Sequence, residues 1–333
     1  MANLLFHCDV INERGSTAAL FEYISLCRDA GHNVTWAYNL DSPNNQKSLA
    51  LVQEDFNTIA VSSVEKFAHS ASKKFDWVYL LKKGLHDGLL IPGIPNNVHA
   101  IFQYYQPHGD SYAYISDWLA RTMSRSQNEY IPARIRSYIP FEKLKLSSVP
   151  FSVNLPLPAT NLRAEFGIPD EAKLCLRFGG METFDIPWVK RILIESLDED
   201  PNLWFLGVNT EKFTAHKRAV FAPPIFGLQT KADLIGSADF ILHARRQGES
   251  FGMNILESMQ GGKPVLAWYG GWDRNHVALL DKSSLYFTPL DLKSKILGYG
   301  RNSDVQRNLA VGDSFRPHRI FPRFQSVFGH NVI

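Results

Sequence analysis

The chain of 333 residues has few cysteines and no long apolar runs. Its three cysteines, Cys8, Cys27 and Cys175, are widely separated in the sequence. A disulfide framework or a cysteine metal site needs paired or closely spaced cysteines, so we expect neither of them. No apolar run approaches the roughly 20 residues that a membrane-spanning helix requires, so we expect no integral membrane segment.

The N-terminus and the charge balance also lack distinctive features. The first 15 residues, MANLLFHCDVINERG, carry no basic stretch before they become charged, so we expect no signal peptide and a cytoplasmic protein. The 35 basic residues are nearly balanced by 33 acidic ones, which leaves a formal net charge of +2. A general nucleic-acid binder has a clear basic excess, so we expect no nucleic-acid partner.

Hydrophobic residues make up 45% of the chain, which is enough for a well-buried globular core. Short apolar segments alternate with amphipathic ones, as is typical of α/β proteins with parallel sheets. We expect helices at residues 17–30 and 187–197. The expected strands are LLFH, NVTW, TIAV, WVYLL and VHAIFQYY in the first half, and LCLRF, NLWFLGV, FILHA, PVLAW and SLYF in the second.

A proline-rich stretch separates the two halves, with prolines at positions 132, 140, 150, 156 and 158. We interpret it as the crossing between two Rossmann-like domains. Ligands of open α/β sheets bind at the carboxyl ends of the strands. The loops that follow the expected strands are therefore where we look for chemistry.

Two loops of the first half carry candidate residues. Gly15 begins the helix after LLFH, and either lets the backbone approach a phosphate or sugar, or belongs to a turn capped by Ser or Thr. His108, Gly109 and Asp110 follow VHAIFQYY, at an expected carboxyl end. Here His108 is a candidate to bond a sugar hydroxyl and Asp110 to accept a proton, although Asp110 would equally serve to cap a turn.

Two loops of the second half also carry candidate residues whose role the sequence does not decide. Gly179, Gly180 and Thr183 follow LCLRF, where they would either hold a diphosphate or relieve crowding between helix and sheet. Asn209 follows NLWFLGV in another polar loop that is ambiguous by itself.

The segment at residues 240–272 is more specific. It contains Glu249 and Glu257, eight residues apart, between two expected strands and two glycine turns. The spacing alone carries no information, but this order places an acid and several free backbone N–H groups at one helix N-terminus. Such an end attracts phosphates. Arg245 and Arg246 precede it, and an arginine fork matches a diphosphate.

The run GESFGMNILESMQGGKPVLAWYGG resembles the donor-site signature of the retaining glycosyltransferases of family 4. VHAIFQYY with SYAYISDWLART, and LPATNLRAEFGIPDEAKLCLRFGG, agree with this family in the same order. The resemblance implies the GT-B fold, an α/β architecture of two Rossmann-like domains whose parallel sheets face across a cleft. The implied domains are residues 1–152 on the acceptor side, 153–312 for the donor, and a helix in 313–333 that crosses back.

The resemblance assigns different tasks to the two glutamates. Glu249 is expected to contact the reacting donor sugar, and Glu257 to bind the ribose. With His108 and Asp110, Glu249 forms our expected catalytic set. Residues 225–228 occupy the position where the backbone reads the base. The other expected donor-binding residues are Gly15, Gly179, Gly180, Thr183, Asn209, Phe226, Gly227, Arg245, Arg246, Ser250, Phe251, Gly252 and Met253.

The family also implies a reaction without a metal or other cofactor, because the nucleotide-sugar is a co-substrate. We expect a UDP-sugar donor, with a GDP-sugar as the alternative. The expected acceptor is a soluble glycan or glycoprotein oligosaccharide, because the first half contains no basic amphipathic helix for a membrane surface.

The sequence departs from the family at one point. The family usually places an Arg and a Lys after the first strand of the donor domain, where this chain has GGMETFDI. We expect Arg245 or Arg246 to supply the missing charge. The same departure supports an alternative, an inactive nucleotide-sugar binding protein on this scaffold. A two-domain sugar-binding protein of the periplasmic type is a third reading, disfavoured by the lack of a signal peptide.

Overall fold

The computed structural model describes residues 1–129, 146–298 and 305–333. The chain divides into two compact units, one formed by Met1–Ser152 with Arg316–Ile333 and the other by Val153–Phe315. The sequence analysis placed these divisions after residues 152 and 312. Two prolines of the expected crossing, Pro132 and Pro140, lie outside the described residues.

Unit 1 is built on a six-stranded parallel sheet with the order β3-β2-β1-β4-β5-β6. Its central strands are buried, which explains why they read as nearly continuous apolar runs. The strands are β1 (Asn3–Cys8), β2 (Asn33–Asn39), β3 (Asn57–Val61), β4 (Trp77–Lys82), β5 (Asn96–Ala100) and β6 (Ser111–Tyr114). The helices are α1 (Gly15–Asp29), α2 (Gln46–Asp55), α3 (Val64–Ala71), α4 (Asp117–Glu129) and α12 (Pro317–Phe328).

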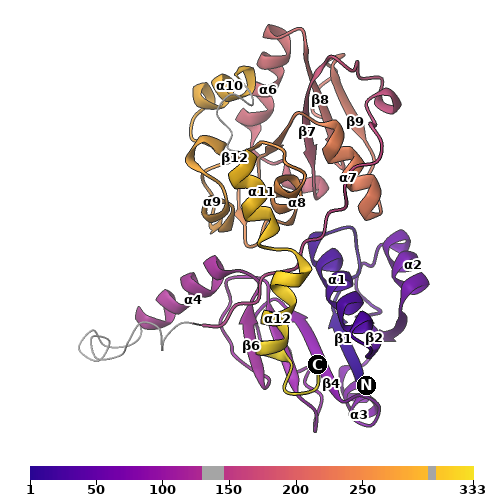
Figure 1. Cartoon of the computed structure of the whole chain (residues 1–333). Coiled ribbons are helices and arrows are strands. Elements are labelled where there is room, and N and C mark those ends of the chain that lie inside the picture. The colour runs from indigo at the N-terminus through magenta and orange to yellow at the C-terminus, as the bar shows by residue number, and fades with distance from the viewer. Residues whose placement is uncertain (130–145, 299–304) are drawn as a thin grey trace. The chain divides into compact units, whose positions relative to one another are not determined.

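The last helix, α12, packs on the sheet of unit 1 beside α1 (Figure 1). The ring of Phe324 stacks on Tyr23 of α1 with centroids 4.4 Å apart. The indole of Trp77 in β4 donates to the carbonyl of Phe328 at 2.6 Å. These buried aromatic contacts make the C-terminal segment part of the core of unit 1.

The strand expected from VHAIFQYY is wrong in its extent. β5 ends at Ala100, and residues 101–110 return along the sheet to the amino end of a strand that was not expected, β6. The hydroxyl of Tyr114 donates to the carbonyl of Tyr104 at 2.7 Å, which ties this returning segment to β6. The aromatic residues that suggested a longer strand therefore pack as a loop.

Unit 2 is built on a second six-stranded parallel sheet, with the order β14-β12-β10-β7-β8-β9. The strands are β7 (Lys173–Phe178), β8 (Leu203–Val208), β9 (Ala219–Ala222), β10 (Phe240–His243), β12 (Val265–Trp268) and β14 (Leu285–Tyr286). The helices are α6 (Pro187–Glu199), α7 (Leu228–Ser237), α8 (Met253–Gln260), α9 (Asn275–Leu279), α10 (Pro289–Leu297) and α11 (Val305–Asp313). The short 3-10 turns are η2 (Ala164–Phe166), η3 (Met181–Thr183) and η4 (Lys282–Ser284).

A separate pair of two-residue strands, β11 (Gly248–Glu249) and β13 (Asp273–Arg274), also belongs to unit 2. Two residues are too short to leave an alternating pattern, so the sequence did not indicate them. The expected class, α/β with two parallel sheets, is confirmed.

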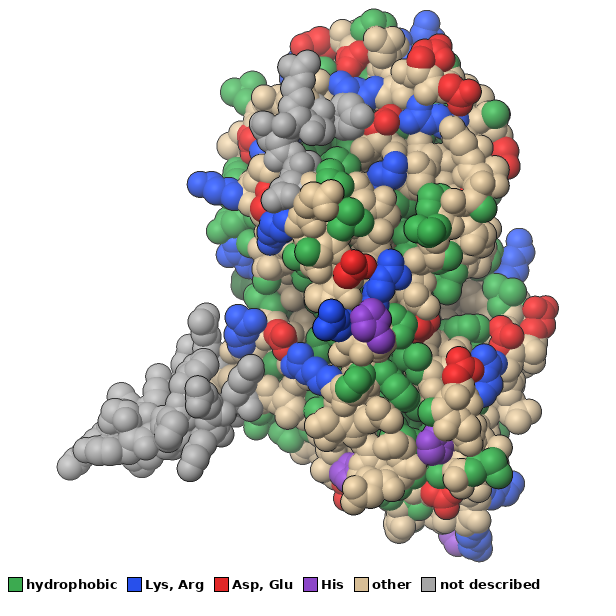
Figure 2. Space-filling view, in the orientation of Figure 1, with side chains coloured by type: hydrophobic (Ala, Val, Ile, Leu, Met, Phe, Trp, Pro, Cys, Tyr) green, Lys and Arg blue, Asp and Glu red, His purple; other side chains and the backbone are tan. Residues whose placement is uncertain are grey.

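Basic and acidic side chains are spread over the face drawn in Figure 2, in keeping with the small net charge. No helix within the described ranges is long and apolar enough to cross a membrane.

Candidate functional site

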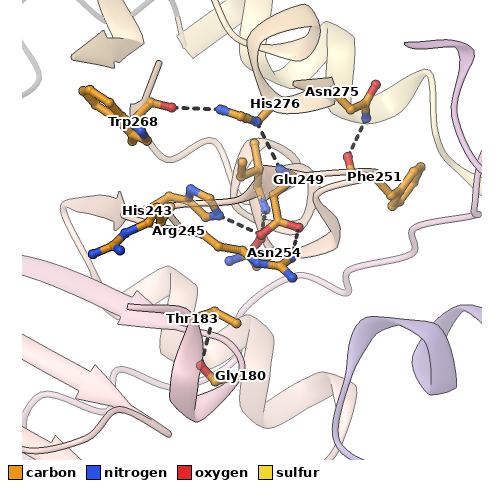
Figure 3. Close-up of polar contacts among 12 residues, drawn as sticks. Gly180, Thr183, His243, Arg245, Glu249, Phe251, Asn254, Trp268, Asn275 and His276 are labelled. Atoms are coloured by element: carbon orange, nitrogen blue, oxygen red, sulfur yellow. Dashed lines mark hydrogen bonds and ion pairs between the residues drawn. The ribbon is translucent and has the colours of Figure 1, made fainter. Parts of the chain in front are cut away.

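The carboxyl edge of the sheet in unit 2 carries several of the expected site residues, and Figure 3 shows Gly180, Thr183, Arg245, Glu249 and Phe251 there. The side-chain amide of Asn209, after β8, donates to the carbonyl of Gly179, after β7, at 2.9 Å. Asn254, in the first turn of α8, donates to the carbonyl of Phe178 at 3.2 Å. The loops after β7 and β8 and the start of α8 are thus joined by direct hydrogen bonds.

Glu249 is held in place by the small β11–β13 sheet, where it pairs with Arg274. Its neighbour Gly248 has a φ of +79°, and a Cβ there would lie 2.0 Å from the carbonyl oxygen of Asp273. Only glycine fits this close approach of two backbones. The glycine before Glu249 therefore determines where the acid lies.

The carboxylate of Glu249 is nearly buried and is bound at both oxygens. One oxygen accepts from Nε2 of His243 at 2.9 Å, and the other from the guanidinium of Arg245 at 3.0 Å. Burial raises the pKa of this carboxyl, but the hydrogen bond from His243 and the electrostatic influence of His243 and Arg245 lower it by more. Its pKa therefore lies below the ordinary value, and Glu249 is ionised at neutral pH.

His276 of α9 supports Glu249 from the opposite side. Its Nε2 lies 2.8 Å from the carbonyl of Trp268, to which it must donate, so Nδ1 accepts from the backbone amide of Glu249 at 3.3 Å. Burial, followed by the influence of His243, lowers the pKa of His276 to about 4, which keeps the ring neutral. Next to it, the amide of Asn275 donates to the carbonyl of Phe251 at 2.5 Å.

The sequence analysis missed His243, Asn275 and His276. Asn275 and His276 follow β13, and they reach Phe251 and Glu249, respectively, only because β13 pairs with β11. No local sequence pattern predicts such a contact.

The N-terminus of α8 lies just beyond Glu249. Its cap residue, Gly252, has a φ of +90° and provides no side-chain cap, while the first-turn amide of Ile255 donates to the side chain of Asn254 at 3.0 Å. The start of α7 is similar, because its cap residue Gly227 has a φ of +88° and lacks a side-chain cap. Uncapped helix starts with glycine at the cap expose N–H groups that suit an anion. Phe226, Gly227, Ser250, Phe251 and Met253 all lie at these two helix starts.

Glu257 lies in the second turn of α8 and is buried. Its carboxylate forms an ion pair with Nζ of Lys231 in α7 at 2.7 Å. The backbone amide of Lys231 bonds to the carbonyl of Gly227 at the start of the same helix, at 3.3 Å. Glu257 is therefore linked to the segment around Phe226 and Gly227 through Lys231, a residue that the sequence analysis did not identify.

Arg177 of β7 is the main connector of the neighbouring loops. Its buried guanidinium donates to the carbonyls of Asn209 at 2.7 Å and Gly180 at 2.6 Å, and to the hydroxyl of Thr183 at 2.8 Å. Burial lowers its pKa to about 10, against the opposing influence of nearby carboxylates, so it stays charged. Thr183 in turn donates to Gly180 at 2.9 Å, so its hydroxyl is already engaged within the loop.

The two arginines expected to grip a diphosphate differ from each other. The Arg245 guanidinium binds Glu249, as described above. Arg246 is exposed, and its strongest contact uses its backbone amide, which donates to the carboxylate of Asp185 at 2.6 Å. Its guanidinium reaches only the carbonyl of Asp185, at 3.4 Å. Arg245 is thus better placed than Arg246 to contact a diphosphate beside Glu249.

In unit 1, Gly15 is the first residue of α1, after β1, as expected. The expectation that Asp110 follows a carboxyl end is wrong, because Asp110 precedes β6 at the amino end of the sheet. Its carboxylate accepts from the backbone amide of Asn96, the first residue of β5, at 2.7 Å. This contact ties the loop to the start of β5, 14 residues earlier, and is not the turn cap considered as the alternative.

His108 lies in the same returning segment, not directly at the end of a strand. Its Nδ1 contacts the carbonyl of Gln106 at 2.5 Å, and its ring lies 4.7 Å from that of His86. Burial lowers the pKa of His108, although the bond to Gln106 opposes this. Across the parts of the chain that the structure describes, no three His, Cys, Asp or Glu side chains are arranged to hold a metal.

Comparison with known proteins identifies the fold. No protein-family model and no curated protein sequence matches the chain. Among solved structures, it is similar to Alr3699/HepE of Anabaena in complex with UDP and glucose, with 14% identity over 99% of this chain and 100% of the other, and a TM-score of 0.70. A glycosyltransferase of Rickettsia africae is 13% identical over 98% and 97% of the two chains, with a TM-score of 0.68.

WaaG, a glycosyltransferase involved in lipopolysaccharide biosynthesis, is 16% identical over 98% of this chain and 100% of its own, with a TM-score of 0.61. These similarities extend over almost the whole length of each protein. The chain has the GT-B fold.

Proposed function

We propose that this chain is a glycosyltransferase of family 4 that transfers a sugar from a UDP-sugar to a hydroxyl of a glycan, with retention at the anomeric carbon. The observation that carries the proposal is the nearly buried, ionised Glu249, held by His243 and Arg245 directly before the N-terminus of α8, whose cap residue is Gly252. It lies at the edge of the sheet where open α/β proteins bind ligands. The similar Anabaena protein binds UDP and glucose.

The proposed roles follow from this arrangement. Glu249 accepts hydrogen bonds from hydroxyls of the donor sugar, while amides of Gly252 and Met253 at the start of α8 bind the diphosphate. Glu257, oriented by Lys231, binds the ribose. Backbone groups near Phe226 read the base. Helix N-termini and Arg245 stabilise the charge that develops on the leaving diphosphate, so the reaction needs no metal.

Within this proposal, we favour a front-face reaction in which the leaving diphosphate takes the proton of the acceptor. Both carboxylate oxygens of Glu249 are already bound, to His243 and Arg245. A carboxylate bound in this way is a poor nucleophile for a double displacement.

The inactive nucleotide-sugar binding protein remains the second candidate. It is supported by the loop after β7, where Arg177 is engaged with carbonyls of the protein and no Arg or Lys occurs in GGMETFDI.

Two measurements test the proposal. A thermal-shift panel should show stabilisation by UDP and a UDP-sugar, because a ligand that binds only the folded state raises its stability. GDP and a GDP-sugar serve as the matched comparison. Hydrolysis of the UDP-sugar, measured as UDP release with and without EDTA, should then be detectable and unaffected by the chelator. Stabilisation without hydrolysis would favour the binding protein, and no stabilisation by any nucleotide would refute both.

A further inference from the structure

An exposed group of aromatic side chains lies at the same edge of the sheet in unit 2. Tyr269 directly follows β12, Phe287 directly follows β14, and Trp272 lies in the turn before β13. We call these three residues the aromatic patch. Trp272 is 84% exposed, and more than a third of each of the other two is exposed. A single exposed aromatic residue needs no explanation, but a group of them at one edge marks a binding surface.

Two rings of the aromatic patch, those of Tyr269 and Phe287, are held by direct contacts. The rings of Tyr269 and Phe287 lie 4.5 Å apart, and the guanidinium of Arg274 lies 4.3 Å from the centre of the Tyr269 ring. A Cβ on Gly270 would come within 2.4 Å of the Trp268 indole, so this turn has no space for a larger residue.

The following residue, Gly271, has a φ of +111°, and a Cβ there would lie 2.6 Å from the carbonyl oxygen of Gln247. The amide of Asp273 donates to the same carbonyl at 2.9 Å. Trp272 therefore projects from a turn that is pressed against the chain just before Glu249. Because the backbone of this turn is constrained, little backbone freedom is lost when the ring of Trp272 binds a ligand.

The aromatic patch adjoins the proposed sugar site. Arg274, which stacks on Tyr269, is the direct β-sheet partner of Glu249. In the large sheet, β12 and β14 lie on one side of β10, whereas β7, β8 and β9 lie on the other. The helix α7, where we place the nucleotide base, follows β9. The aromatic patch is thus on the side of Glu249 that faces away from the base.

Distances along the sheet suit a carbohydrate. Neighbouring strands are about 4.8 Å apart, so β12 and β14 lie roughly 5 and 10 Å from β10, which corresponds to one or two sugar rings. A stable protein partner would need about 800 Å² on this side of the interface, which is more than three side chains provide. The C–H bonds on one face of a pyranose complement the negative face of an aromatic ring.

We propose that the aromatic patch, with Arg274 at its border, is a subsite for a sugar residue of the acceptor glycan. The rings of Trp272 and Tyr269 stack on the apolar face of this sugar, and Arg274 donates hydrogen bonds to its hydroxyls. The proposal rests on the proposed glycosyltransferase function and extends it to the recognition of the acceptor.

Saturation-transfer NMR on the full chain tests it, with methyl α-D-glucopyranoside, methyl α-D-mannopyranoside, methyl β-D-galactopyranoside and maltotriose as probes. We expect at least one of them to receive saturation through its ring protons when UDP is present. Trp272→Ala and Tyr269→Ala should each raise the dissociation constant of that sugar about 3- to 10-fold, the loss expected for one aromatic contact. Leu157→Ala is the matched control, because Leu157 is also 84% exposed and lies in the same unit.

The outcomes separate this inference from the proposed function. If UDP stabilises the protein but no sugar binds, or if Trp272→Ala and Leu157→Ala bind sugar equally well, the subsite is refuted and the transferase proposal stands. If sugar binding depends on Trp272 but no nucleotide stabilises the protein, the transferase proposal fails and the aromatic sugar site stands. Loss of a dimer in Trp272→Ala, seen by size-exclusion chromatography, would identify the aromatic patch as an interface between copies and refute the subsite.

Discussion

The carboxyl edges of the two parallel sheets hold buried groups of opposite charge. In unit 1, Lys82 at the end of β4 is bound by the carboxylate of Asp87 and, at 2.8 Å, by the carbonyl of Leu89. In unit 2, Glu249 is bound by His243 and Arg245. The partners of Lys82 all come from the loop that directly follows it, whereas the environment of Glu249 is assembled from three segments.

Each charge has a neutral histidine in its surroundings. Burial, followed by the charge of Lys82, lowers the pKa of His7 to about 4, and burial does the same for His276 near Glu249. The surroundings of Lys82 and Glu249 differ in the helix start that lies at each carboxyl edge. Beside Glu249 lies the N-terminus of α8, whose cap residue is Gly252, whereas the cap residue of α1 in unit 1 is Arg14. The charge in unit 1 holds the loop that follows β4, and we propose that the charge in unit 2 belongs to a ligand site.

The largest expected effect tests this distinction directly. Glu249→Gln should lower the rate of UDP-sugar hydrolysis about 10²–10³-fold, because a charged acceptor that contacts the reacting sugar is lost. Binding of UDP should stay within about twofold, since the diphosphate contacts of α8 remain. UDP release and thermal shift measure the two quantities. The matched control is Glu182→Gln, an exposed acid after β7, and a parallel collapse of UDP binding in Glu249→Gln would contradict the assigned role.

Acid should destabilise unit 1 more than unit 2. Burial lowers the pKa of His7 to about 4 and of His99 to about 3 in unit 1, and that of His276 to about 4 in unit 2, from an ordinary 6.5. Below pH 6.5 the unfolded chain binds protons that the folded chain does not. Each histidine therefore lowers the free energy of unfolding by up to about 1.4 kcal/mol per pH unit as the pH falls toward its folded pKa.

Hydrogen exchange at pH 7, 6 and 5, corrected for intrinsic rates, resolves the two units. We expect the stability of β4 and β5 to fall more steeply than that of β7 and β10. His99→Phe should flatten the response of unit 1, and His69→Gln, at an exposed position, should not. If unit 2 lost stability at a higher pH than unit 1, this prediction would be contradicted.

Lys82→Met should lower the free energy of unfolding by about 1–3 kcal/mol, because the carboxylate of Asp87 and the carbonyl of Leu89 lose their partner. Urea unfolding measures this change, and Lys83→Met, at the exposed neighbouring residue, is the control. Stabilisation by UDP should be unchanged. A loss of UDP binding in Lys82→Met alone would show that the edge of unit 1 also contributes to the ligand site.

The smallest expected effect separates the two arginines. Arg245→Ala should weaken UDP binding about tenfold and uridine binding little, because only the charge-assisted contact with the diphosphate is lost. Arg246→Ala should change both by less than about twofold, since its main contact uses the backbone. Isothermal titration with UDP and uridine distinguishes these outcomes. Equal losses for UDP and uridine in Arg245→Ala would refute a diphosphate contact.

The strands that could be predicted were the buried, continuous ones. LLFH, WVYLL, LCLRF and NLWFLGV all correspond to strands, because residues buried on both faces of a parallel sheet leave long apolar runs. The run VHAIFQYY was predicted to be a longer strand because it is a continuous apolar run. Its aromatic residues instead pack in the loop that returns to β6. That error placed Asp110 at the wrong end of the sheet.

The site could be predicted in outline only. Glu249, Glu257 and the helix between them are close in sequence, and a glycine before a helix start is a local pattern. His276, Lys231 and Arg177 could not be recognised, because each reaches the site from another element of unit 2: α9, α7 and β7, respectively.

Local order along the chain thus established the alternation of strands and helices, the α/β class and the acid next to a helix N-terminus. The tertiary structure determines which charged and polar groups come into contact. Glu249 is ionised and oriented because β13 brings His276 against its backbone, and because β10 and the following turn bring His243 and Arg245 to its carboxylate. Tyr269 and Phe287 likewise came into contact only because β12 and β14 lie side by side in the sheet. Short-range patterns encode elements, whereas the pKa of a buried group depends on neighbours that are distant in the sequence.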